Sequence, residues 1–429
     1  MKTLIQNGTV VNPKGAQGRL DILIENGVIV QMAERLAADD AVVVEAAGKT
    51  VCPGFCDMHV HFREPGQEYK ETIRTGAMAA VAGGFTSVAC MPNTSPVVDN
   101  QALVRYILEK AREANLAKVY PIACITKGMQ GKELTEMGLL QEAGAIAFSD
   151  DGRPVENSRI MKLALQYAKQ FGALLISHCE DLALAEHGVM NLGKTSTMLG
   201  LPGIPSACED VMIAREIILA EMLDTKVHIA HVSTKTGCQL IREAKARGVK
   251  VTAETAPHYL VATDALVESM DTATKVNPPL REEADRQAVI QGVMDGTLDV
   301  IITDHAPHHA DDKEVEYNSA ANGIVGLETS FALSYTELVA KHGMPITRLV
   351  EKMSVRPHEI LGIEGGVLAE GKPADITMVD LNWQGKIDKN TFYSKGHNTP
   401  FDGWDVQGRV TDTFVDGRHV YQNGEIVKE

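Results

Sequence analysis

The sequence has few of the features that mark secreted or membrane proteins. Its seven cysteines are odd in number and form no Cys-x-x-Cys pair, which argues against a disulfide framework and favours a reducing compartment. No apolar run approaches the length of a membrane span. Gln6, Asn7 and Gly8 interrupt the start before the apolar segment of a signal peptide could form. We therefore expect a cytoplasmic protein.

Positive charge is scarce as well. Lys and Arg number 41 against 57 Asp and Glu, a formal net charge of −16. This balance argues against nucleic acid or an anionic membrane as the main partner and favours small molecules. With 44% hydrophobic residues in 429, the chain can bury a sizeable core, and its length suggests one large domain and a small one.

The pattern of short apolar runs changes along the chain. Both ends carry β-rich runs punctuated by Asn-Gly or Asp-Gly, the strongest local hairpin signal. Between them, short apolar runs alternate with helical stretches, as in a parallel sheet. One helical stretch, "VDNQALVRYILEKAREAN", has Asp99 as a plausible N-cap. Eight apolar runs lie around residues 53–58, 85–91, 119–125, 145–149, 173–177, 226–231, 250–254 and 299–303.

Eight strand–helix units predict an α/β fold, a (β/α)8 TIM-like barrel, and an open doubly wound sheet is the alternative. We expect the barrel over residues 53–364. The two ends, residues 1–52 and 365–429, are expected to fold together as a small β-sandwich satellite domain.

Polar residues follow most of the eight apolar runs. Because the strand ends of an α/β barrel converge on one mouth, these side chains are expected to meet there. They are His59, His61, Asn93, Asp151, His178, His231, Glu254 and Asp304.

Four imidazoles and two carboxylates in this set offer more donors than one tetrahedral zinc needs. Two ions about 3.5–4 Å apart with a bridging carboxylate would use all six, and a nitrogen-rich shell favours Zn²⁺ over Mg²⁺ or Ca²⁺. His228 lies three residues before His231 and is expected on the opposite strand face, as a structural histidine. His258 stays ambiguous.

Four motifs together give the chain a resemblance to a known family. "DMHVHFREPG" at 57–66 and "TDHAPHHADDK" at 303–313 resemble the two signatures of dihydroorotases, in the amidohydrolase superfamily; "MPNT" at 91–94 and "NPPLR" at 277–281 agree with them. The resemblance extends over nearly the whole length and is to the stand-alone bacterial type I form. It implies zinc-dependent interconversion of L-dihydroorotate and N-carbamoyl-L-aspartate in de novo pyrimidine biosynthesis. A homodimer and association with aspartate transcarbamoylase are further family-based expectations.

The resemblance also implies roles for single residues. His59 and His61 would bind one zinc, His178 and His231 the other, and Asp151 both. Asp304 would bind the first zinc and act as catalytic acid and base. The expected substrate contacts are Arg63, Asn93 and His308 to the carboxylate, and Asn277 with the backbone near Asn322 and Gly323 to the ring.

The bridging position departs from the pattern of many amidohydrolases. "GAIAFSDDGRPV" offers no lysine to be carboxylated, so Asp150 or Asp151 must bridge. The resemblance favours Asp151, spacing alone does not separate the two, and a shorter carboxylate leaves the occupancy of the second zinc site open.

Three further alternatives stay open at this point. The function could be that of another cyclic amidohydrolase, an allantoinase or hydantoinase, or of a catalytically silent assembly partner. His308 and the adjacent His309 compete for the ligand. Residues 306–317 form either a loop that covers the ligand or a solvated connection.

Overall fold

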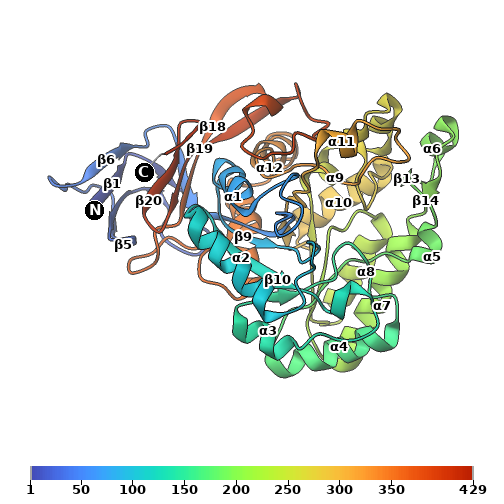
Figure 1. Cartoon of the computed structure of the whole chain (residues 1–429). Helices are drawn as coiled ribbons and strands as arrows, with labels where there is room; N and C mark the ends of the chain where they lie inside the picture. Colours follow the sequence, from blue (N-terminus) through green and yellow to red (C-terminus); the bar gives the residue numbers. More distant parts are fainter. Residues whose placement is uncertain (1, 428–429) are drawn as a thin grey trace.

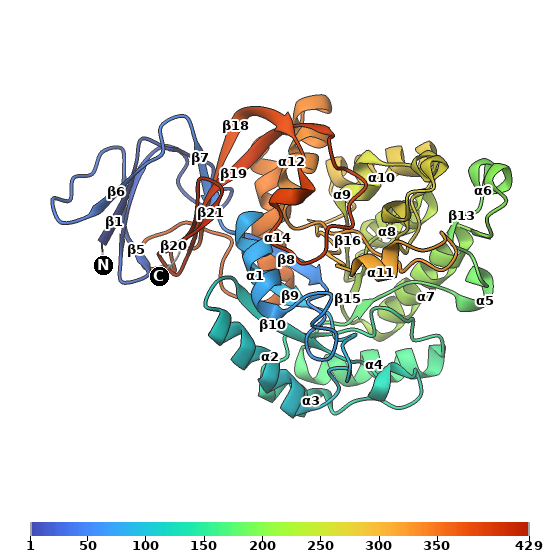
Figure 2. The same ribbon diagram turned by 45° about the horizontal axis from the view of Figure 1, so that its top comes forward.

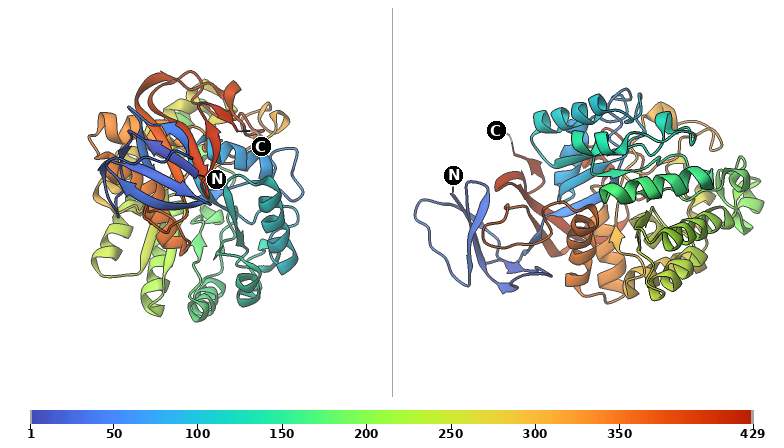
Figure 3. Two further views of the ribbon diagram at one scale, coloured as in Figure 1. Left: turned by 90° about the vertical axis from the view of Figure 1, so that its left-hand side faces the viewer. Right: turned by 90° about the horizontal axis from the view of Figure 1, so that it is seen from below.

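The computed structural model describes residues 2–427 as a large barrel of strands and helices with a smaller β-rich part at one side (Figure 1). The first and last strands of residues 2–427 both lie in the β-rich part, in blue and red in the side and bottom views (Figure 3). Within residues 2–427, no helix combines the length and the apolar character needed to cross a bilayer.

Eight parallel strands build the barrel, as the eight apolar runs predicted. They form two four-stranded sheets, β11-β10-β9-β8 and β12-β15-β16-β17. Backbone bridges close the ring on both sides, between Phe148 and Leu175 and between Val60 and His305. The strands are β8 (Phe55–Val60), β9 (Phe85–Cys90), β10 (Lys118–Ala123), β11 (Ala147–Phe148), β12 (Ile176–Ser177), β15 (Val227–Ile229), β16 (Val251–Thr255) and β17 (Val300–Ile301).

Helices surround this ring. Its main helices are α1 (Ile73–Ala82), α2 (Gln101–Ala114), α3 (Met137–Ala143), α4 (Ser158–Phe171), α7 (Ala207–Leu223), α8 (Lys235–Ala246), α10 (Glu283–Asp295) and α12 (Ser330–Ser334). Further short helices are α9 (Pro257–Val261), α11 (Ala310–Lys313), α13 (Ile346–Val350) and α14 (Arg356–Leu361), and the segments Tyr335–Lys341 and Glu351–Val355 are π-helical.

The predicted cap of α2 is wrong by one residue. Asn100 is the N-cap, and its side chain accepts hydrogen bonds from the backbone N–H groups of Ala102 and Leu103. The Asp99 carboxylate instead accepts a hydrogen bond from Gly128 N at 2.9 Å. Asp99 therefore holds a neighbouring loop.

An excursion between β12 and α7 has no counterpart in the sequence analysis. It contains α5 (Leu182–Ala185), β13 (Met190–Asn191), α6 (Lys194–Leu199) and β14 (Gly203–Ile204). Figure 2 shows it at the end of the barrel farthest from the chain termini.

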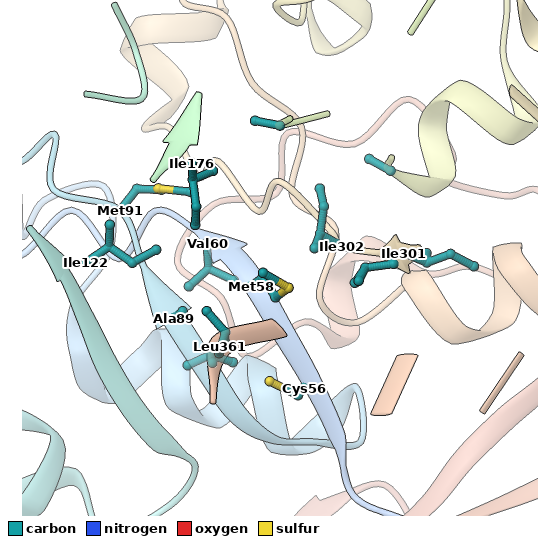
Figure 4. Close-up of a cluster of buried hydrophobic side chains, with 14 of the residues drawn as sticks. Cys56, Met58, Val60, Ala89, Met91, Ile122, Ile176, Ile301, Ile302 and Leu361 are labelled. Atoms are coloured by element: carbon teal, nitrogen blue, oxygen red, sulfur yellow. The ribbon is translucent and has the colours of Figure 1, made fainter. Parts of the chain in front are cut away.

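One continuous apolar cluster fills the barrel and the space beneath its helices. Figure 4 shows Met58 and Val60 of β8 in the same buried cluster as Ile122 of β10 and Ile176 of β12. Burial of one such side chain contributes about 1.5–3 kcal/mol. This packing fixes the positions of the strands whose ends carry the polar residues.

The β-rich part joins both ends of the chain. One sheet has the order β5-β4-β1-β6 and the other β21-β20-β19-β18-β7-β2-β3. Ile5, Ile24 and Val51 share a buried cluster with Ile376 and Phe414, so the ends pack on each other. The strands are β1 (Lys2–Gln6), β2 (Thr9–Val10), β3 (Gly18–Arg19), β4 (Asp21–Glu25), β5 (Val28–Ala33), β6 (Val42–Glu45), β7 (Thr50–Pro53), β18 (Ile376–Lys386), β19 (Asp405–Val415), β20 (Arg418–Gln422) and β21 (Glu425–Ile426).

Candidate metal centre and active site

The two signature stretches lie against each other where the barrel closes. His61 N donates to His305 O at 2.8 Å, and Arg63 Nε donates to Pro307 O at 3.2 Å. The turn that contains Gly66 packs on Ser95, the residue directly after "MPNT", since a Cβ at Gly66 would lie 1.7 Å from Ser95 O. The motifs that are far apart in sequence therefore build one mouth.

Three of the predicted site residues have unusual backbone angles. The φ values of Arg63, His231 and Asp304 are 62°, 31° and 50°. Non-glycine residues in this region cost of order 1–3 kcal/mol each and concentrate at functional sites, where the surrounding structure enforces them. The backbone thus turns these side chains out of the regular strand direction.

The Asp151 carboxylate lies between two pairs of histidines. Its Oδ2 is 3.2 Å from His59 Nε2 and 3.5 Å from His61 Nε2. Its Oδ1 is 3.2 Å from His178 Nδ1 and 3.1 Å from His231 Nε2. These side chains form two triads of possible metal ligands with Asp151 in both. One oxygen faces each pair, which is the arrangement a bridging ligand requires.

Asp150 is occupied elsewhere. Its carboxylate accepts hydrogen bonds from Ile125 N at 2.8 Å, from Thr126 N at 3.1 Å and from the Thr126 hydroxyl. These contacts leave Asp151 as the carboxylate that faces the histidines. These contacts favour Asp151 over Asp150, the choice that spacing left open.

Asp304 sits beside the first histidine pair. Its Oδ1 is 3.1 Å from His61 Nε2 and 3.6 Å from His59 Nε2. Burial alone would raise the pKa of Asp304, but the contact with His61 and the charges of His59 and His231 outweigh burial and lower the pKa to about 2. The carboxylate is therefore ionised and able to accept a proton.

The other ring nitrogen of three histidines has an oxygen partner. His59 Nδ1 donates to Glu254 Oε1 at 2.6 Å, and His61 Nδ1 donates to Asn93 Oδ1 at 2.9 Å. His178 Nε2 donates to Glu180 Oε2 at 3.0 Å. Such partners fix the tautomer and ring orientation of metal-ligating histidines. When these rings are neutral, as metal ligation requires, the lone pairs of His59 Nε2, His61 Nε2 and His178 Nδ1 face Asp151.

The geometry fits a cation. His59 Nε2 is buried and has no hydrogen-bond partner among residues 2–427. Burial disfavours a charged His178, yet the contacts with Asp151 and Glu180 outweigh burial and raise its pKa to about 10. Strong stabilisation of positive charge, with lone pairs converging from several imidazoles, is the environment of a divalent metal centre with nitrogen and oxygen ligands.

The expected relation between His228 and His231 holds for a different reason than strand parity. The strand β15 ends at Ile229, so the alternation of faces does not extend to His231. His228 Nε2 donates to Glu254 Oε2 at 3.0 Å, and its Nδ1 accepts from Thr252 Oγ1 at 2.7 Å. His228 thus supports Glu254, which in turn supports His59.

A cavity of about 190 Å³ opens beside the triads. It is lined by His61, Arg63, Asn93, Asp151, Gly152, His178, Val276, Asn277, Asp304, Ala306, Asn322 and Gly323. Five of the six predicted substrate contacts therefore line the same cavity as several of the metal-ligand candidates. Asn277 Nδ2 also donates to Glu180 Oε1 at 3.1 Å, which links the cavity wall to His178.

Gly323 occupies a position that excludes a side chain. Its φ is +148°, and a Cβ there would lie 2.7 Å from Ala306 O and 3.1 Å from the His308 ring. Glycine allows the two segments to approach. The backbone at 322–323 can therefore form the cavity wall directly.

His308 lies behind this wall, and His309 points away from it. His308 Nε2 donates to Asn322 O at 2.8 Å, and Lys70 Nζ donates to His308 Nδ1 at 3.3 Å. Burial and the charges of Arg63 and Lys70 lower the His308 pKa to about 2. His309 is the N-cap of α11, with a side chain 48% exposed. Of the two, His308 is next to Arg63.

Two buried polar residues near the mouth had no assigned role in the sequence analysis. Asp57 accepts from Thr303 N at 3.2 Å and from Thr303 Oγ1 at 2.5 Å, which ties β8 to the segment that carries Asp304. His258 is buried, burial lowers its pKa to about 4, and its Nε2 has no partner among residues 2–427. The position of Asp57 in the first signature was the available signal for its role.

The family model and the curated proteins that match this chain carry the same family description. Residues 48–237 match the family model described as Dihydro-orotase-like. The chain is 53% identical over 418 residues to a dihydroorotase of Acetivibrio thermocellus. The aligned region covers 97% of this chain and 98% of that protein. It is 53% identical over 424 residues to a dihydroorotase of Pelobacter propionicus, with 98% of this chain and 100% of that protein covered.

Solved structures of cyclic amidohydrolases have the same fold. The L-hydantoinase (dihydropyrimidinase) from Arthrobacter aurescens superposes with a TM-score of 0.90 at 26% identity, over 100% of this chain and 97% of that one. The dihydropyrimidinase from Brevibacillus agri NCHU1002 matches in fold, with a TM-score of 0.87 at 24% identity, over 100% and 96% of the two chains.

Proposed function

The chain belongs to the dihydroorotase family, and from that premise we propose that it is a metal-dependent enzyme that interconverts L-dihydroorotate and N-carbamoyl-L-aspartate. We place this reaction in de novo pyrimidine biosynthesis. Ring opening transfers an acyl group from the ring nitrogen to water. The enzyme must therefore bind an anionic ring, activate water and protonate the leaving nitrogen.

A single observation carries the proposal. Each oxygen of Asp151 faces a separate pair of histidines at 3.1–3.5 Å, next to the cavity that contains Arg63 and Asp304. A catalytically silent relative would have no need of this complete set of ligands. The arrangement supports catalysis.

We propose two Zn²⁺ ions, one held by His59, His61 and Asp304, the other by His178 and His231, with Asp151 shared. The number of imidazole nitrogens supports zinc over magnesium or calcium. When bound, the ions supply Lewis-acid chemistry that polarises a carbonyl and makes water easier to deprotonate.

Asp304 is the group placed to move the proton. Its carboxylate is ionised, lines the cavity and lies beside His61. It accepts the proton of the attacking water and delivers it to the ring nitrogen as the amide bond breaks. By reversibility, the same carboxylate serves ring closure.

Arg63 is the group that binds the substrate carboxylate. Burial lowers its pKa to about 10, so the guanidinium stays charged at neutral pH. Its Nε is already held by Pro307 O, and a guanidinium fixed in this way can present its remaining donors to a carboxylate. Asn93, oriented by His61, and Asn277, oriented by Glu180, supply further polar contacts.

A hydantoinase-type activity is the second candidate, because the L-hydantoinase structure shares the fold at 26% identity. The difference lies in the substrate. A buried, charged Arg63 in the cavity suits a ring that bears a carboxylate, whereas hydantoin has no carboxylate to neutralise it.

The test is to load the protein with zinc, add L-dihydroorotate and follow the loss of its ultraviolet absorbance, with hydantoin and allantoin as parallel substrates. We expect turnover of dihydroorotate far above that of the other two. Preferred hydrolysis of hydantoin or allantoin, or no turnover of any substrate by fully metal-loaded protein, would refute the assignment.

A further inference from the structure

Lys313, the last residue of the second signature, has a buried side chain that the mechanism above does not use. Its Nζ donates to three backbone carbonyls, Ala321 O at 2.8 Å, Gly323 O at 3.2 Å and Lys275 O at 3.3 Å. The residue is 6% exposed, and it forms no ion pair among residues 2–427.

These carbonyls belong to two segments that both contribute residues to the cavity lining. Ala321 and Gly323 flank Asn322, and Lys275 precedes Val276 and Asn277. Gly323 N also donates to Lys275 O at 2.9 Å, so the two segments already touch. The ammonium lies where it can hold both at once.

Stability alone gives a weak reason for a lysine at this position. Burial and the charge of Lys275 lower the Lys313 pKa to about 7, although Asp271 and Asp312 oppose them. A buried cation without an ion pair is costly. Two of the three carbonyls have other donors, since Lys275 O accepts from Gly323 N and Gly323 O accepts from Asn398 Nδ2 at 2.9 Å.

We propose that Lys313 is a positioning residue for substrate binding, whose side chain fixes the 275–277 segment relative to the 321–323 segment. The inference rests on the proposed function, because the two segments are the predicted contacts of the substrate ring. Lys313 itself does not line the cavity and acts through Asn277, Asn322 and Gly323.

The matched control is Lys352, another buried lysine. It is 3% exposed, and its Nζ donates to Leu298 O at 2.6 Å, away from the cavity-lining residues. Lys313→Met and Lys352→Met remove the same group from two buried sites. Lys313→Gln keeps an amide donor and serves where Lys313→Met does not fold.

The experiment measures KM and kcat for L-dihydroorotate, zinc content, and hydrogen exchange of the 314–326 peptide. For Lys313→Met we expect KM to rise about tenfold or more, because small displacements of positioning groups have large effects. We expect zinc content to be unchanged and the Gly323 amide to exchange faster. Lys313→Gln should fall between the wild type and Lys313→Met, and Lys352→Met should leave KM and the exchange of this peptide unchanged.

Unchanged KM and unchanged exchange in Lys313→Met would overturn the proposal. An equal rise of KM in Lys352→Met would also overturn it, since the effect would then reflect general loss of stability. Failure of the proposed function is recognised separately, because the wild type would then not turn over dihydroorotate, while the exchange comparison still reports whether Lys313 joins the two segments.

Discussion

Glu254 Oε1 lies 2.6 Å from His59 Nδ1, and both residues are completely buried. The other carboxylate oxygen of Glu254 accepts from His228 Nε2 at 3.0 Å. Burial would raise the pKa of Glu254, but the two histidines outweigh it and lower the pKa to about 2. An ionised Glu254 therefore keeps the Nδ1 proton on His59 and leaves Nε2 free to bind a metal.

Substitution Glu254→Gln should weaken metal binding. Outer partners of metal-ligating histidines are typically worth about 10–100-fold in metal affinity or activity, and we expect a loss of that size in zinc affinity, measured by competition with a chelator. Glu216→Gln is the control, because Glu216 is equally buried but contacts Ser177 and Arg215. Equal zinc affinity in Glu254→Gln and the wild type would contradict this role.

Substitution Asp304→Asn should separate catalysis from metal binding. An amide of the same shape cannot take up the proton, so kcat should fall by about 10²–10⁴. Zinc content should stay largely intact, since His59, His61 and Asp151 remain. The measurement is turnover together with zinc analysis of the same sample, and undiminished turnover would remove Asp304 from proton transfer.

Substitution Arg63→Ala should raise KM for N-carbamoyl-L-aspartate with zinc retained. Hydrogen bonds to charged groups contribute about 1.5–3 kcal/mol, which corresponds to roughly ten- to hundredfold in KM. Arg63→Lys keeps the positive charge but loses the planar guanidinium, so its KM should lie between those of the wild type and Arg63→Ala. A KM that Arg63→Ala leaves unaltered would exclude the carboxylate contact.

The neighbours Asp150 and Asp151 form a matched pair for the bridging role. Asp151→Asn should lower the zinc stoichiometry, because both triads share this side chain. Asp150→Asn should leave the stoichiometry unchanged and cost about 1–3 kcal/mol of stability, since its carboxylate accepts from Ile125 N and Thr126 N. Zinc analysis and thermal unfolding distinguish them, and full zinc in Asp151→Asn would disprove the bridge.

Lys352 predicts a specific pH dependence of stability. Burial lowers its pKa from the ordinary 10.5 to about 8 in the folded protein. Between these values the unfolded chain binds more protons, so this residue makes the free energy of unfolding rise with pH, by up to about 1.4 kcal/mol per unit. Lys352→Met lacks this contribution. In denaturant unfolding from pH 7.5 to 10, the free energy of unfolding of Lys352→Met should fall further below that of the wild type as pH rises. If the two free energies change in parallel with pH, the lowered pKa of Lys352 is contradicted.

Much of the molecule follows from the order of residues alone. Eight short apolar runs that alternate with helical stretches predict eight parallel strands and a barrel, because parallel strands are buried on both faces. The polar residues that end those runs meet at one mouth, since all strand ends of a barrel point the same way. The sequence alone therefore predicts that five of the candidate metal ligands lie close together: His59, His61, His178, His231 and Asp304.

Other features depended on contacts that no periodicity contains. Asp150 and Asp151 are equivalent by spacing, and only the hydrogen bonds from Ile125 and Thr126 to Asp150 separate them. His231 faces the mouth because strand β15 ends before it, at Ile229. The roles of Glu254 and Lys313 depend on hydrogen-bond partners in other segments. Local sequence sets strand and helix preferences, whereas the partner of a buried polar group is determined by which segments the closed barrel brings together.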